Sequence, residues 1–565
     1  MQKFEKLTLK EVLKKSAELY PKRPALALVD GAPITYEELR QYVDEVSHFM
    51  QQEGIGKGDR VAILSESKPN WGIAYFAVTT LGAVAVPILP DFHQSAVQHI
   101  IRHSKCKAIF ISKKQYEKIE DCRFEALKTV ILIDDFQLIE PNMSKAKLEE
   151  ALQNGIREIL KIRDVALRLT GRKENDVEEE DTAAVIYTSG TTGHSKGVML
   201  THKNIVWTAQ TTRSIVKITE VDRLLSILPL SHTYECTLGF VIPIMSGACI
   251  YYLDKPPTPR LLVQSLQNIK PTMMLSVPLV IEKIYKTRIA PELRKNTIVR
   301  TLSKSSLILK RLHKIAGKKL MKTFGGELHF FGVGGAALSP EVEKFLREAE
   351  FPYSIGYGLT ETSPLIAGTD AAHTRYRSTG PPIPGVEVKI GNPDEKTGEG
   401  EILVKGPNVM KGYFKDSERT KEVFTEDGYF RTGDLGVVDE DGYLYIKGRL
   451  KNMILGPSGE NIYPEEIEAI INDQDCVLES IVFQQQEKLV ARVFLNYEKL
   501  DEDFSTKNFS ETRMSREIQK LLENCRKNVN ENVPAFARLS RFIEQQEPFE
   551  KTPTQKIKRY LYVEE

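Results

Sequence analysis

The sequence predicts an α/β protein in which a large amino-terminal domain is followed by a small α+β domain. The chain has 565 residues, too many for one hydrophobic core, because single cores stop growing at about 250–300 residues. Short apolar strands alternate with helical patterns as far as residue 380, which favours an α/β sheet. Beyond that point the strands are separated by turns rich in glycine and aspartate.

The amino-terminal elements follow from hydrophobic pattern and turn residues. Residues 8–53 combine helical patterns with the short strand PALALV and a turn at Asp30-Gly31. DRVAILSES and KAIFIS predict short apolar strands, and WGIAYFAVTTLGAVAVPI between them predicts a buried helix followed by a strand. Residues 142–180 have a helical, charged pattern ending in the acidic run ENDVEEEDT, which we interpret as solvated.

The carboxyl-terminal part has its own pattern. Asp441-Gly442, between GVV and YLYIKG, predicts a tight hairpin. After Lys451 the expected order is helix YPEEIEAIINDQ, strands CVLESIVFQ and KLVARVFL, and helix SREIQKLLENCRKNV. We therefore expect the domain boundary between residues 1–449 and 450–565.

The overall composition argues against several classes of protein. The 78 basic and 77 acidic residues give a formal net charge of +1, which does not suggest a nucleic-acid binder. The six cysteines form no C-x-x-C pair, so neither a zinc site nor a disulfide framework is expected. The amino-terminal stretch lacks an apolar signal segment, and the most apolar runs are shorter than the ~20 residues that span a bilayer. We expect a cytoplasmic protein with reduced thiols.

Residues 186–205, IYTSGTTGHSKGVMLTHKNI, have the composition of a loop that binds phosphate. Glycines and hydroxyls precede Lys196, and the apolar strand AAVIYTS leads into the loop. Glycines free backbone N–H groups to face an anion, and the lysine adds a positive charge. Ser195 stands where a Walker A loop needs its second glycine, so this is a loop of another kind. Taken alone, the stretch could also be an ordinary glycine-rich turn.

Three further stretches carry polar groups suited to chemistry. In YSIGYGLTETSP, glycines flank Tyr357 and let a flat ligand approach, and Thr360 and Glu361 offer a hydroxyl and a carboxylate side by side. FFGVGGAALS is another strand that ends in a glycine turn, and TGD places Asp434 just after a turn, where it could accept the hydrogen bonds of a ribose diol. Lys556 stands among prolines and threonines near the end of the chain, where a plain basic tail is the alternative.

Five of these stretches occur in one order along the chain: YTSGTTGHSKG, GVGGAALS, YGLTETS, YFRTGDLG…GYLYIKGRLKNMI and TPTQKIKR. In this order they resemble the adenylate-forming superfamily, which includes acyl-CoA synthetases, adenylation domains and luciferases. The resemblance covers residues 10–562. It implies the adenylate-forming fold, with an ATP- and acyl-binding domain followed by a small mobile lid domain.

The resemblance also implies a role for each matching residue. The phosphate loop would be Thr188, Ser189, Gly190, Thr191, Thr192, Gly193 and Lys196. The wall around the adenine and the acyl carboxylate would be Gly334, Gly335, Ala336, Gly356, Tyr357 and Gly358. Thr360 would contact the α-phosphate, Glu361 would bind Mg²⁺, and Asp434, Tyr445 and Arg449 would contact the nucleotide, with Asp434 and Arg449 at the ribose. Lys451 would be the hinge, and Lys556 would bridge the carboxylate and the α-phosphate.

These roles fit the chemistry of acid activation. A carboxylate is a poor electrophile, and ATP converts it to an acyl-adenylate with a good leaving group. The carboxylate and the α-phosphate are both anionic, so the attack needs cations, namely Mg²⁺ and a lysine. Three positions depart from the usual pattern: Ser195 replaces a proline, Asn452 an acid, and Gln555 a glycine. Every predicted catalytic side chain is nevertheless present.

The subfamily is a narrower prediction. LGPSGENIYPEEIE and TPTQKIKR look most like long-chain fatty acid–CoA ligases, which use ATP, Mg²⁺ and CoA. His232, in LPLSHTYE, would line the entrance for the acyl carboxylate, with a packing histidine as the alternative. An acyl–acyl-carrier-protein synthetase would share the first half-reaction. A non-catalytic acyl-binding protein is disfavoured because Glu361 and Lys556 are both retained.

Residues 294–322 contain many basic residues and no acidic one. Within them, KSSLILKRLHKIAGKKLMK has helical spacing. Leu312, Ile315, Ala316 and Leu320 are expected on one side and Lys304, Lys310, Arg311, Lys314, Lys318 and Lys322 on the other. Such a helix could dock peripherally on the anionic inner face of a membrane, where a long-chain acid is found. In the alternative, the apolar side packs into the core.

Overall fold

The computed structural model describes residues 4–563 except 121, 142, 146, 150–175, 190–194, 256–257, 295–305, 457–459, 475, 498–499, 501–510 and 553–555. The chain divides into two compact units. The first comprises Met1–Ala337, Phe345–Glu387 and Val404–Phe430, and the second comprises Leu338–Lys344, Val388–Leu403 and Arg431–Glu565. The division between 1–449 and 450–565 stays a prediction.

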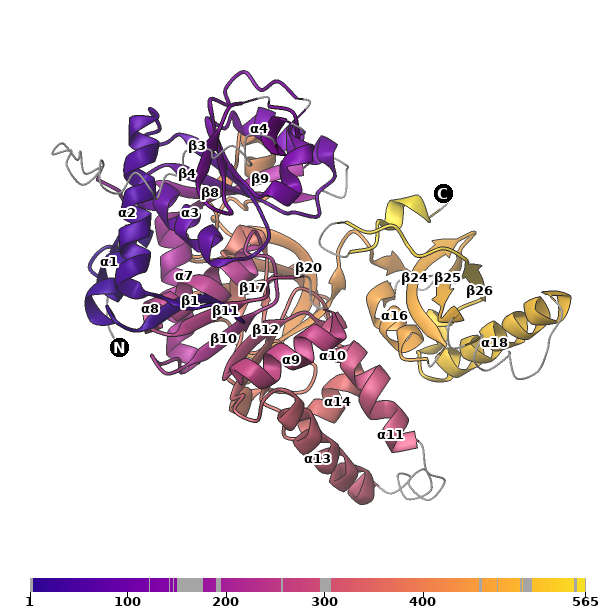
Figure 1. Cartoon of the computed structure of the whole chain (residues 1–565). Coiled ribbons are helices and arrows are strands. Elements are labelled where there is room, and N and C mark those ends of the chain that lie inside the picture. Colours follow the sequence, from indigo (N-terminus) through magenta and orange to yellow (C-terminus); the bar gives the residue numbers. More distant parts are fainter. Residues whose placement is uncertain are drawn as a thin grey trace. The chain divides into compact units, whose positions relative to one another are not determined.

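The first unit contains two large sheets with helices packed on them (Figure 1). One sheet has the order β14-β13-β12-β10-β11-β1-β2 and is parallel except for the β1–β2 pair. Its strands are β1 (Pro24–Leu28), β2 (Ile34–Thr35), β10 (Arg223–Ser226), β11 (Cys249–Tyr252), β12 (Met273–Ser276), β13 (Phe330–Val333) and β14 (Tyr353–Ile355). This sheet confirms the predicted α/β class.

The other sheet has the order β19-β9-β8-β4-β3-β5-β6-β7. Its strands are β3 (Arg60–Leu64), β4 (Val84–Ile88), β5 (Ala108–Ile111), β6 (Thr129–Leu132), β7 (Gln137–Ile139), β8 (Thr182–Ser189), β9 (Ser195–Thr201) and β19 (Gly412–Tyr413). The central strands are parallel, whereas β7, β9 and β19 each pair antiparallel with a neighbour. Strand β19 therefore reaches the phosphate-loop hairpin β8–β9 from far along the chain.

The core between the two sheets is built around α3 (Pro69–Thr80). Its residues Trp71 to Thr79 are all buried, as the apolar stretch WGIAYFAVTT predicts. Trp71 stacks on Tyr75 with ring centroids 5.2 Å apart, and Phe240 packs against both rings. Residues of both sheets join the same hydrophobic cluster, so α3 ties the sheets together.

The remaining helices of the first unit cover the sheets. They are α1 (Leu9–Leu19), α2 (Tyr36–Gln52), α4 (Gln94–Ser104), η1 (Lys113–Lys118), α7 (His202–Ile215), η3 (Tyr234–Val241), α8 (Ile242–Ser246), α9 (Pro259–Ile269), α10 (Pro278–Ile284), η4 (Tyr285–Ile289), α11 (Ala290–Arg294), α13 (Ser306–Thr323), η5 (Thr360–Thr362), η6 (Ala371–His373) and α15 (Ser417–Glu422). Helix α14 (Pro340–Glu348) is divided between the two units.

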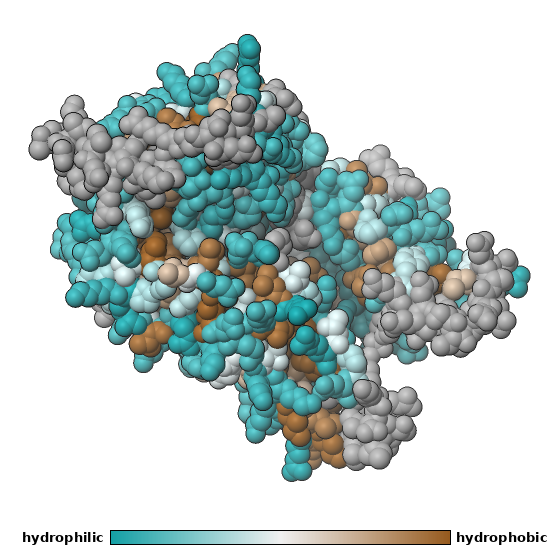
Figure 2. All heavy atoms as spheres, viewed as in Figure 1, coloured by the Kyte–Doolittle hydropathy of each residue, from teal (hydrophilic) through white to brown (hydrophobic). Residues whose placement is uncertain are grey.

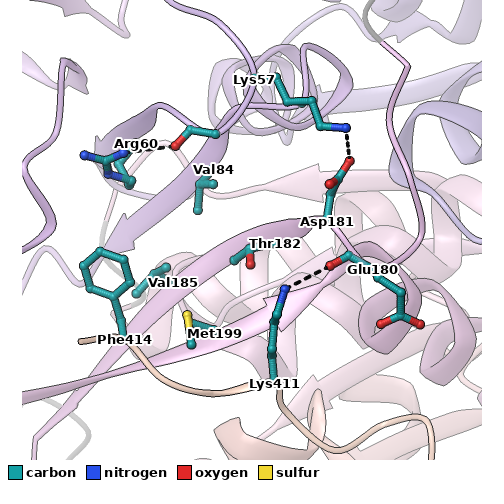
Figure 3. A pocket seen from close by; sticks show the side chains of 12 residues that line it. Lys57, Arg60, Val84, Glu180, Asp181, Thr182, Val185, Met199, Lys411 and Phe414 are labelled. Carbon is teal, nitrogen blue, oxygen red and sulfur yellow. Dashed lines mark hydrogen bonds and ion pairs between the residues drawn. The ribbon is translucent and has the colours of Figure 1, made fainter. Parts of the chain in front are cut away.

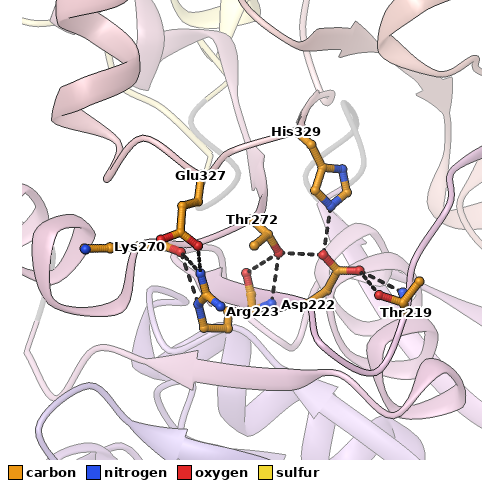
Figure 4. Close-up of polar contacts among 7 residues, drawn as sticks. All are labelled: Thr219, Asp222, Arg223, Lys270, Thr272, Glu327 and His329. Atoms are coloured by element: carbon orange, nitrogen blue, oxygen red, sulfur yellow. Dashed lines mark hydrogen bonds and ion pairs between the residues drawn. The ribbon is translucent and has the colours of Figure 1, made fainter.

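A polar network joins the strands of the first sheet at their amino ends (Figure 4). Asp222, just before β10, accepts hydrogen bonds from the Thr272 hydroxyl at 2.7 Å and from His329 Nε2 at 2.8 Å. Its other oxygen accepts from the backbone N–H and the hydroxyl of Thr219. Burial alone would raise the pKa of Asp222, but these hydrogen bonds hold it well below its usual value. The network fixes the strand starts relative to one another.

Helix α13 faces the core with only part of the apolar side that the sequence predicts. His313 and Leu320 are 6% and 3% exposed, and the His313 ring contacts Glu348 at the end of α14. Ile315, expected on the same apolar side as Leu320, is 59% exposed, and Leu307 is 76% exposed. Exposed apolar and basic residues therefore share the solvent-facing side of α13.

The second unit begins with a four-stranded sheet, order β17-β18-β20-β21. Its strands are β17 (Glu387–Gly391), β18 (Gly400–Lys405), β20 (Phe430–Val438) and β21 (Leu444–Arg449). The β20–β21 hairpin turns at Asp441-Gly442, as predicted, and Gly442 has a φ of +84°, which suits glycine. The short pair β22 (Ile454–Leu455) and β23 (Asn461–Ile462) follows.

The rest of the second unit has the α+β pattern that the sequence predicts. Strands β24 (Val477–Gln485), β25 (Lys488–Leu495) and β26 (Arg541–Gln545) form a sheet, and α16 (Pro464–Asn472) and α18 (Glu511–Glu531) share its core. The short helices η7 (Ala535–Ala537) and η8 (Arg559–Leu561) complete the unit. Within the described part of the chain, no helix is long and apolar enough to cross a membrane.

Candidate active site

The predicted wall residues of the first unit gather at one edge of the first sheet. Gly334 follows β13 and donates its backbone N–H to Ser276 at the end of β12, at 3.1 Å. Gly356 follows β14 and donates to Val333 at the end of β13, at 2.9 Å. These are carboxyl ends of parallel strands, where open α/β sheets bind their ligands. The residues brought to this edge are Gly334, Gly335, Ala336, Gly356, Tyr357 and Gly358.

At two of these positions the backbone conformation requires a residue without a side chain. A Cβ on Gly358 would lie 1.8 Å from the carbonyl oxygen of Pro364, because β15 (Tyr357–Gly358) pairs closely with β16 (Leu365–Ala367). Gly335 has a φ of +86°, which other residues rarely adopt. The conformation of both loops therefore depends on residues without side chains.

His232 lies in the turn after β10, whose neighbour in the sheet is β12. The turn thus follows a carboxyl strand end of the same sheet, as the predicted role at the acyl entrance requires. Sequence reasoning overlooked Tyr234, two residues further on. A Cβ on Gly334 would lie 3.2 Å from the Tyr234 ring, so this half-buried phenol packs against the glycine turn. Its place in LPLSHTYE was the only available signal.

The predicted phosphate loop connects β8 to β9. Thr188 pairs with Lys196 and Ser189 with Ser195 across this hairpin, so both sides of the loop are placed. Gly190, Thr191, Thr192 and Gly193 lie outside the described residues. The Thr188 hydroxyl is buried and has no hydrogen-bond partner among the described residues.

Lys196 meets two side chains that come from distant parts of the first unit. Its ammonium donates to Glu361 Oε1 at 2.8 Å and to the Tyr413 hydroxyl at 2.6 Å. The Tyr413 hydroxyl in turn donates to the same Glu361 oxygen at 3.0 Å. The ammonium also lies 4.4 Å from the centroid of the Tyr413 ring, within the range of a cation–π contact. Two residues of the predicted site are thus in direct contact.

Tyr413 is the member of this cluster that sequence reasoning missed. It lies in β19, which pairs with β9 so that Tyr413 stands opposite Val198, two residues from Lys196. Its position in the chain, 217 residues after Lys196, gives no sign of this contact. The glycine before it, in KGYF, was the only local signal.

The electrostatics of this cluster favour an ionised carboxylate. Burial would raise the pKa of Glu361, but the Lys196 charge and the hydrogen bonds from Lys196 and Tyr413 outweigh it and lower the pKa. Burial and the neighbouring Glu361 raise the pKa of Tyr413, so the phenol keeps its proton. A buried anionic carboxylate oxygen is the kind of ligand that Mg²⁺ prefers, so Glu361 fits the predicted metal role. Among the described residues, no cluster of three or more histidine, cysteine or acidic side chains could hold a metal by itself.

Thr360 begins η5 in the first unit, next to Glu361, and the second unit carries the remaining predicted residues. Asp434 in β20 and Arg449 in β21 face each other across the hairpin, with Nε 3.1 Å from Oδ1. Tyr445 donates its hydroxyl to Asp439 at 3.2 Å. Lys451 is exposed and lies two residues after the end of β21, and Lys556 is exposed near η8. The structure thus brings Asp434 and Arg449 together, as the predicted ribose pair requires.

A surface cavity of about 310 Å³ lies at the other end of β8, away from the phosphate loop (Figure 3). Its wall includes Arg60, Thr182 and Met199. Its charged groups are engaged locally: Lys57 pairs with Asp181 at 2.7 Å, and Arg60 donates to the backbone carbonyls of Gly58, Ser104 and Lys105. None of the predicted site residues that the structure describes lines this cavity.

The chain is similar to proteins of known family. A family model described as AMP-binding enzyme matches residues 13–414. The long-chain-fatty-acid–CoA ligase FadD15 of Mycobacterium bovis is 30% identical over 80% of this chain and 76% of its own length. The long-chain-fatty-acid–CoA ligase heimdall of Drosophila melanogaster is 29% identical over 83% of this chain and 73% of its own. The crystal structure of ATP-bound MatB from Rhodopseudomonas palustris has the same fold, with a TM-score of 0.74 at 23% identity and 98% of both chains covered.

Proposed function

The chain belongs to the AMP-binding enzyme family, and on that premise we propose that it is an ATP-dependent fatty acid–CoA ligase. It converts a fatty acid and ATP to an acyl-adenylate and pyrophosphate. It then transfers the acyl group to the thiol of CoA, which releases AMP. The observation that supports this best is the meeting of Lys196 and Glu361 beside the phosphate loop, where a phosphate and its metal would need opposite charges.

The residues of the first unit divide the work of adenylation. The backbone and hydroxyls of the phosphate loop, with Lys196, bind the β- and γ-phosphates that leave as pyrophosphate. Glu361 would hold Mg²⁺, which would neutralise charge on the phosphates during the displacement. Thr360 contacts the α-phosphate, and His232 lines the entrance for the acid. The glycine turns at Gly334 and Gly356 form the wall for adenine and the carboxylate.

The residues of the second unit act on the nucleotide and the acid. Asp434 and Arg449 hold the ribose, with Tyr445 nearby in β21. Lys556 brings a positive charge to the carboxylate and the α-phosphate, whose mutual repulsion would otherwise oppose the attack. Lys451 is the hinge at which residues 450–565 rotate, so that Lys556 is present for adenylation and absent for thioester formation.

A long-chain acid is the proposed substrate. Two relatives, 29% and 30% identical to this chain, are named long-chain-fatty-acid–CoA ligases, and both align with most of this chain. An assay over a series of chain lengths tests this substrate class. Pyrophosphate release and acyl-CoA formation are measured with saturated acids from acetate to stearate. We expect activity to rise toward the long acids. Highest activity with acetate, malonate or an aromatic acid would contradict the proposal.

The acceptor is tested in the same assay. CoA is compared with a holo acyl-carrier protein at equal thiol concentration. Rapid thioester formation with CoA supports the proposal, and a preference for the carrier protein would make the chain an acyl–acyl-carrier-protein synthetase. Adenylate formation without either thioester would contradict both.

We further propose that α13 docks on an anionic membrane surface. Its solvent-facing side carries Leu307 and Ile315 next to Arg311, Lys318 and Lys322, and Figure 2 shows hydrophobic and hydrophilic residues together at the lower end of the view. No ion pair with a described residue engages those three basic side chains, whereas Lys319 pairs with Glu292. Mixed apolar and cationic groups suit the boundary between lipid headgroups and acyl chains. A fatty acid dissolved in that membrane would be close to the enzyme.

A further inference from the structure

Lys196, Glu361 and Tyr413 form a closed triangle of polar contacts in the first unit. Each distance is that of a hydrogen bond: 2.8 Å from Lys196 to Glu361, 2.6 Å from Lys196 to Tyr413, and 3.0 Å from Tyr413 to Glu361. The three residues come from β9, η5 and β19. The phenol oxygen accepts a hydrogen bond from the ammonium, and the phenol O–H donates one to the carboxylate, so its hydrogen-bonding capacity fits both charged partners.

The opposite charges of Lys196 and Glu361 compensate each other in a site that is largely shielded from water. Glu361 is 7% exposed, and the Lys196 side chain is 26% exposed. A buried charge that loses its partner is strongly disfavoured, so neither group can leave the other without a replacement. The same two groups are the ones that adenylation needs, Lys196 for the phosphates and Glu361 for the metal.

We infer that Tyr413 is a positioning residue that holds Lys196 and Glu361 in a resting ion pair, which ATP and Mg²⁺ must open together. This inference rests on the proposed function. A phosphate that takes Lys196 by itself leaves the buried Glu361 carboxylate without a cation. A metal ion that takes Glu361 by itself leaves Lys196 beside another positive charge. When both bind, one ion pair is exchanged for two, so each ligand strengthens the binding of the other.

Tyr413 keeps the Lys196 side chain in place while Lys196 exchanges the Glu361 carboxylate for a phosphate. The ring under the ammonium and the hydroxyl beside it are contacts that do not depend on Glu361. The β9–β19 pairing fixes the backbone of Tyr413 opposite Val198, two residues from Lys196 on the same strand. Lys196 can therefore exchange the carboxylate for a phosphate without a large change in its own position.

The test measures binding rather than turnover. ATP is titrated calorimetrically into the full-length protein, once with excess EDTA and once with excess MgCl₂. We expect Mg²⁺ to tighten ATP binding to the wild type at least fivefold, within the usual range of coupling between ligands. The Glu361→Gln variant has no ion pair to open, so it should bind ATP in EDTA more tightly than the wild type and gain less from Mg²⁺.

Tyr413→Phe tests the positioning role, with Tyr429→Phe as its matched control. Tyr429 also donates its hydroxyl to a carboxylate, that of Glu387 at 2.9 Å, but it lies outside the triangle. Tyr413→Phe should weaken binding of ATP with Mg²⁺ about fivefold and raise the KM for ATP, while the KM for dodecanoate stays constant. Tyr429→Phe should change neither. Matching melting temperatures of the variants exclude a general loss of structure.

Three results would overturn the inference. If Glu361→Gln binds ATP in EDTA no more tightly than the wild type, the ion pair does not oppose ATP binding and that part of the inference is wrong. If Tyr413→Phe changes ATP binding and the KM for ATP no more than Tyr429→Phe does, Tyr413 has no positioning role. A wild type that binds no ATP in either buffer would overturn the proposed function as well, so the two failures are distinguishable.

Discussion

The Ser226 hydroxyl donates a hydrogen bond of 2.5 Å to Glu235 Oε1, inside the core of the first unit. The second oxygen of Glu235 is buried and has no partner among the described residues. Gly239, one turn further on, leaves room for this carboxyl group, because a Cβ there would lie 2.7 Å from it. Glu235 is 1% exposed, and its burial raises the pKa to about 8.

We predict that Glu235→Gln makes the protein more stable at alkaline pH. The pKa of Glu235 is raised above the value of about 4.3 in an unfolded chain, so its contribution is fully present below that pH. The contribution is lost as the pH rises through 8, where the folded protein must bury a charge. Glutamine keeps the shape and the bond from Ser226 without ionising. At pH 9 the variant should be more stable by roughly 1–3 kcal/mol.

Urea unfolding followed by circular dichroism at pH 5, 7 and 9 measures the effect. The advantage of Glu235→Gln over the wild type should grow with pH. Glu440→Gln, at an exposed position, is the control and should show no such trend. A difference between Glu235→Gln and wild type that is the same at all three pH values would refute the explanation.

Asp222→Asn should have the opposite pH dependence. Asp222 accepts four hydrogen bonds, which keep its pKa below the value of about 3.9 in an unfolded chain. Its stabilising contribution is therefore present above that pH and is lost as the pH falls through its folded value. At pH 7 the variant should lose about 1–3 kcal/mol, because an amide replaces an acceptor of charge-assisted bonds.

The same unfolding experiment, extended to pH 3, checks this. The gap between wild type and Asp222→Asn should narrow in acid. Asp441→Asn, at an exposed turn, serves as the control. A gap that widens toward pH 3 would contradict the role given to Asp222.

The sequence predicted local features well and distant contacts poorly. The helix and strand in WGIAYFAVTTLGAVAVPI and the hairpin at Asp441-Gly442 depend on neighbours in the chain, and both are confirmed. The contact of Tyr413 with Lys196 depends on the pairing of β19 with β9, which hydrophobic pattern alone does not specify. Glu361 was found through its motif, but its ion pair with Lys196 was not.

The same limit explains the face of α13. Ile315 and Leu320 fall on one broad apolar arc, and spacing alone cannot tell which part of that arc meets the core. Contacts at the end of α14 determine which side of α13 faces the core. Glu348 binds His313 there, and the Ala349 carbonyl oxygen would lie 2.6 Å from a Cβ on Gly317. The helix therefore turns its His313–Leu320 side inward and leaves Ile315 exposed.

Charge reversal on α13 should abolish binding to anionic vesicles. The wild type should co-sediment with phosphatidylglycerol vesicles but not with phosphatidylcholine vesicles, and binding should fall with salt. Lys318→Glu combined with Lys322→Glu should remove the binding. The control is Lys421→Glu combined with Lys527→Glu, which changes the net charge equally at exposed sites elsewhere. Equal loss of binding in both double variants would show a general charge effect, and salt-independent binding would contradict the mechanism.

Lys556→Ala should separate the two half-reactions. The lysine charge is needed while the carboxylate attacks the α-phosphate, so ATP–pyrophosphate exchange should fall on the order of 10²–10³-fold. Thioester formation from pre-made acyl-adenylate and CoA does not bring these two anions together, so it should stay within a few-fold of the wild type. Lys558→Ala is the matched control, since Lys558 pairs with Glu550 at 3.1 Å and has no proposed role in the chemistry. Equal loss of both half-reactions in Lys556→Ala, with Lys558→Ala unaffected, would show that Lys556 acts in some other way than by bridging the carboxylate and the α-phosphate.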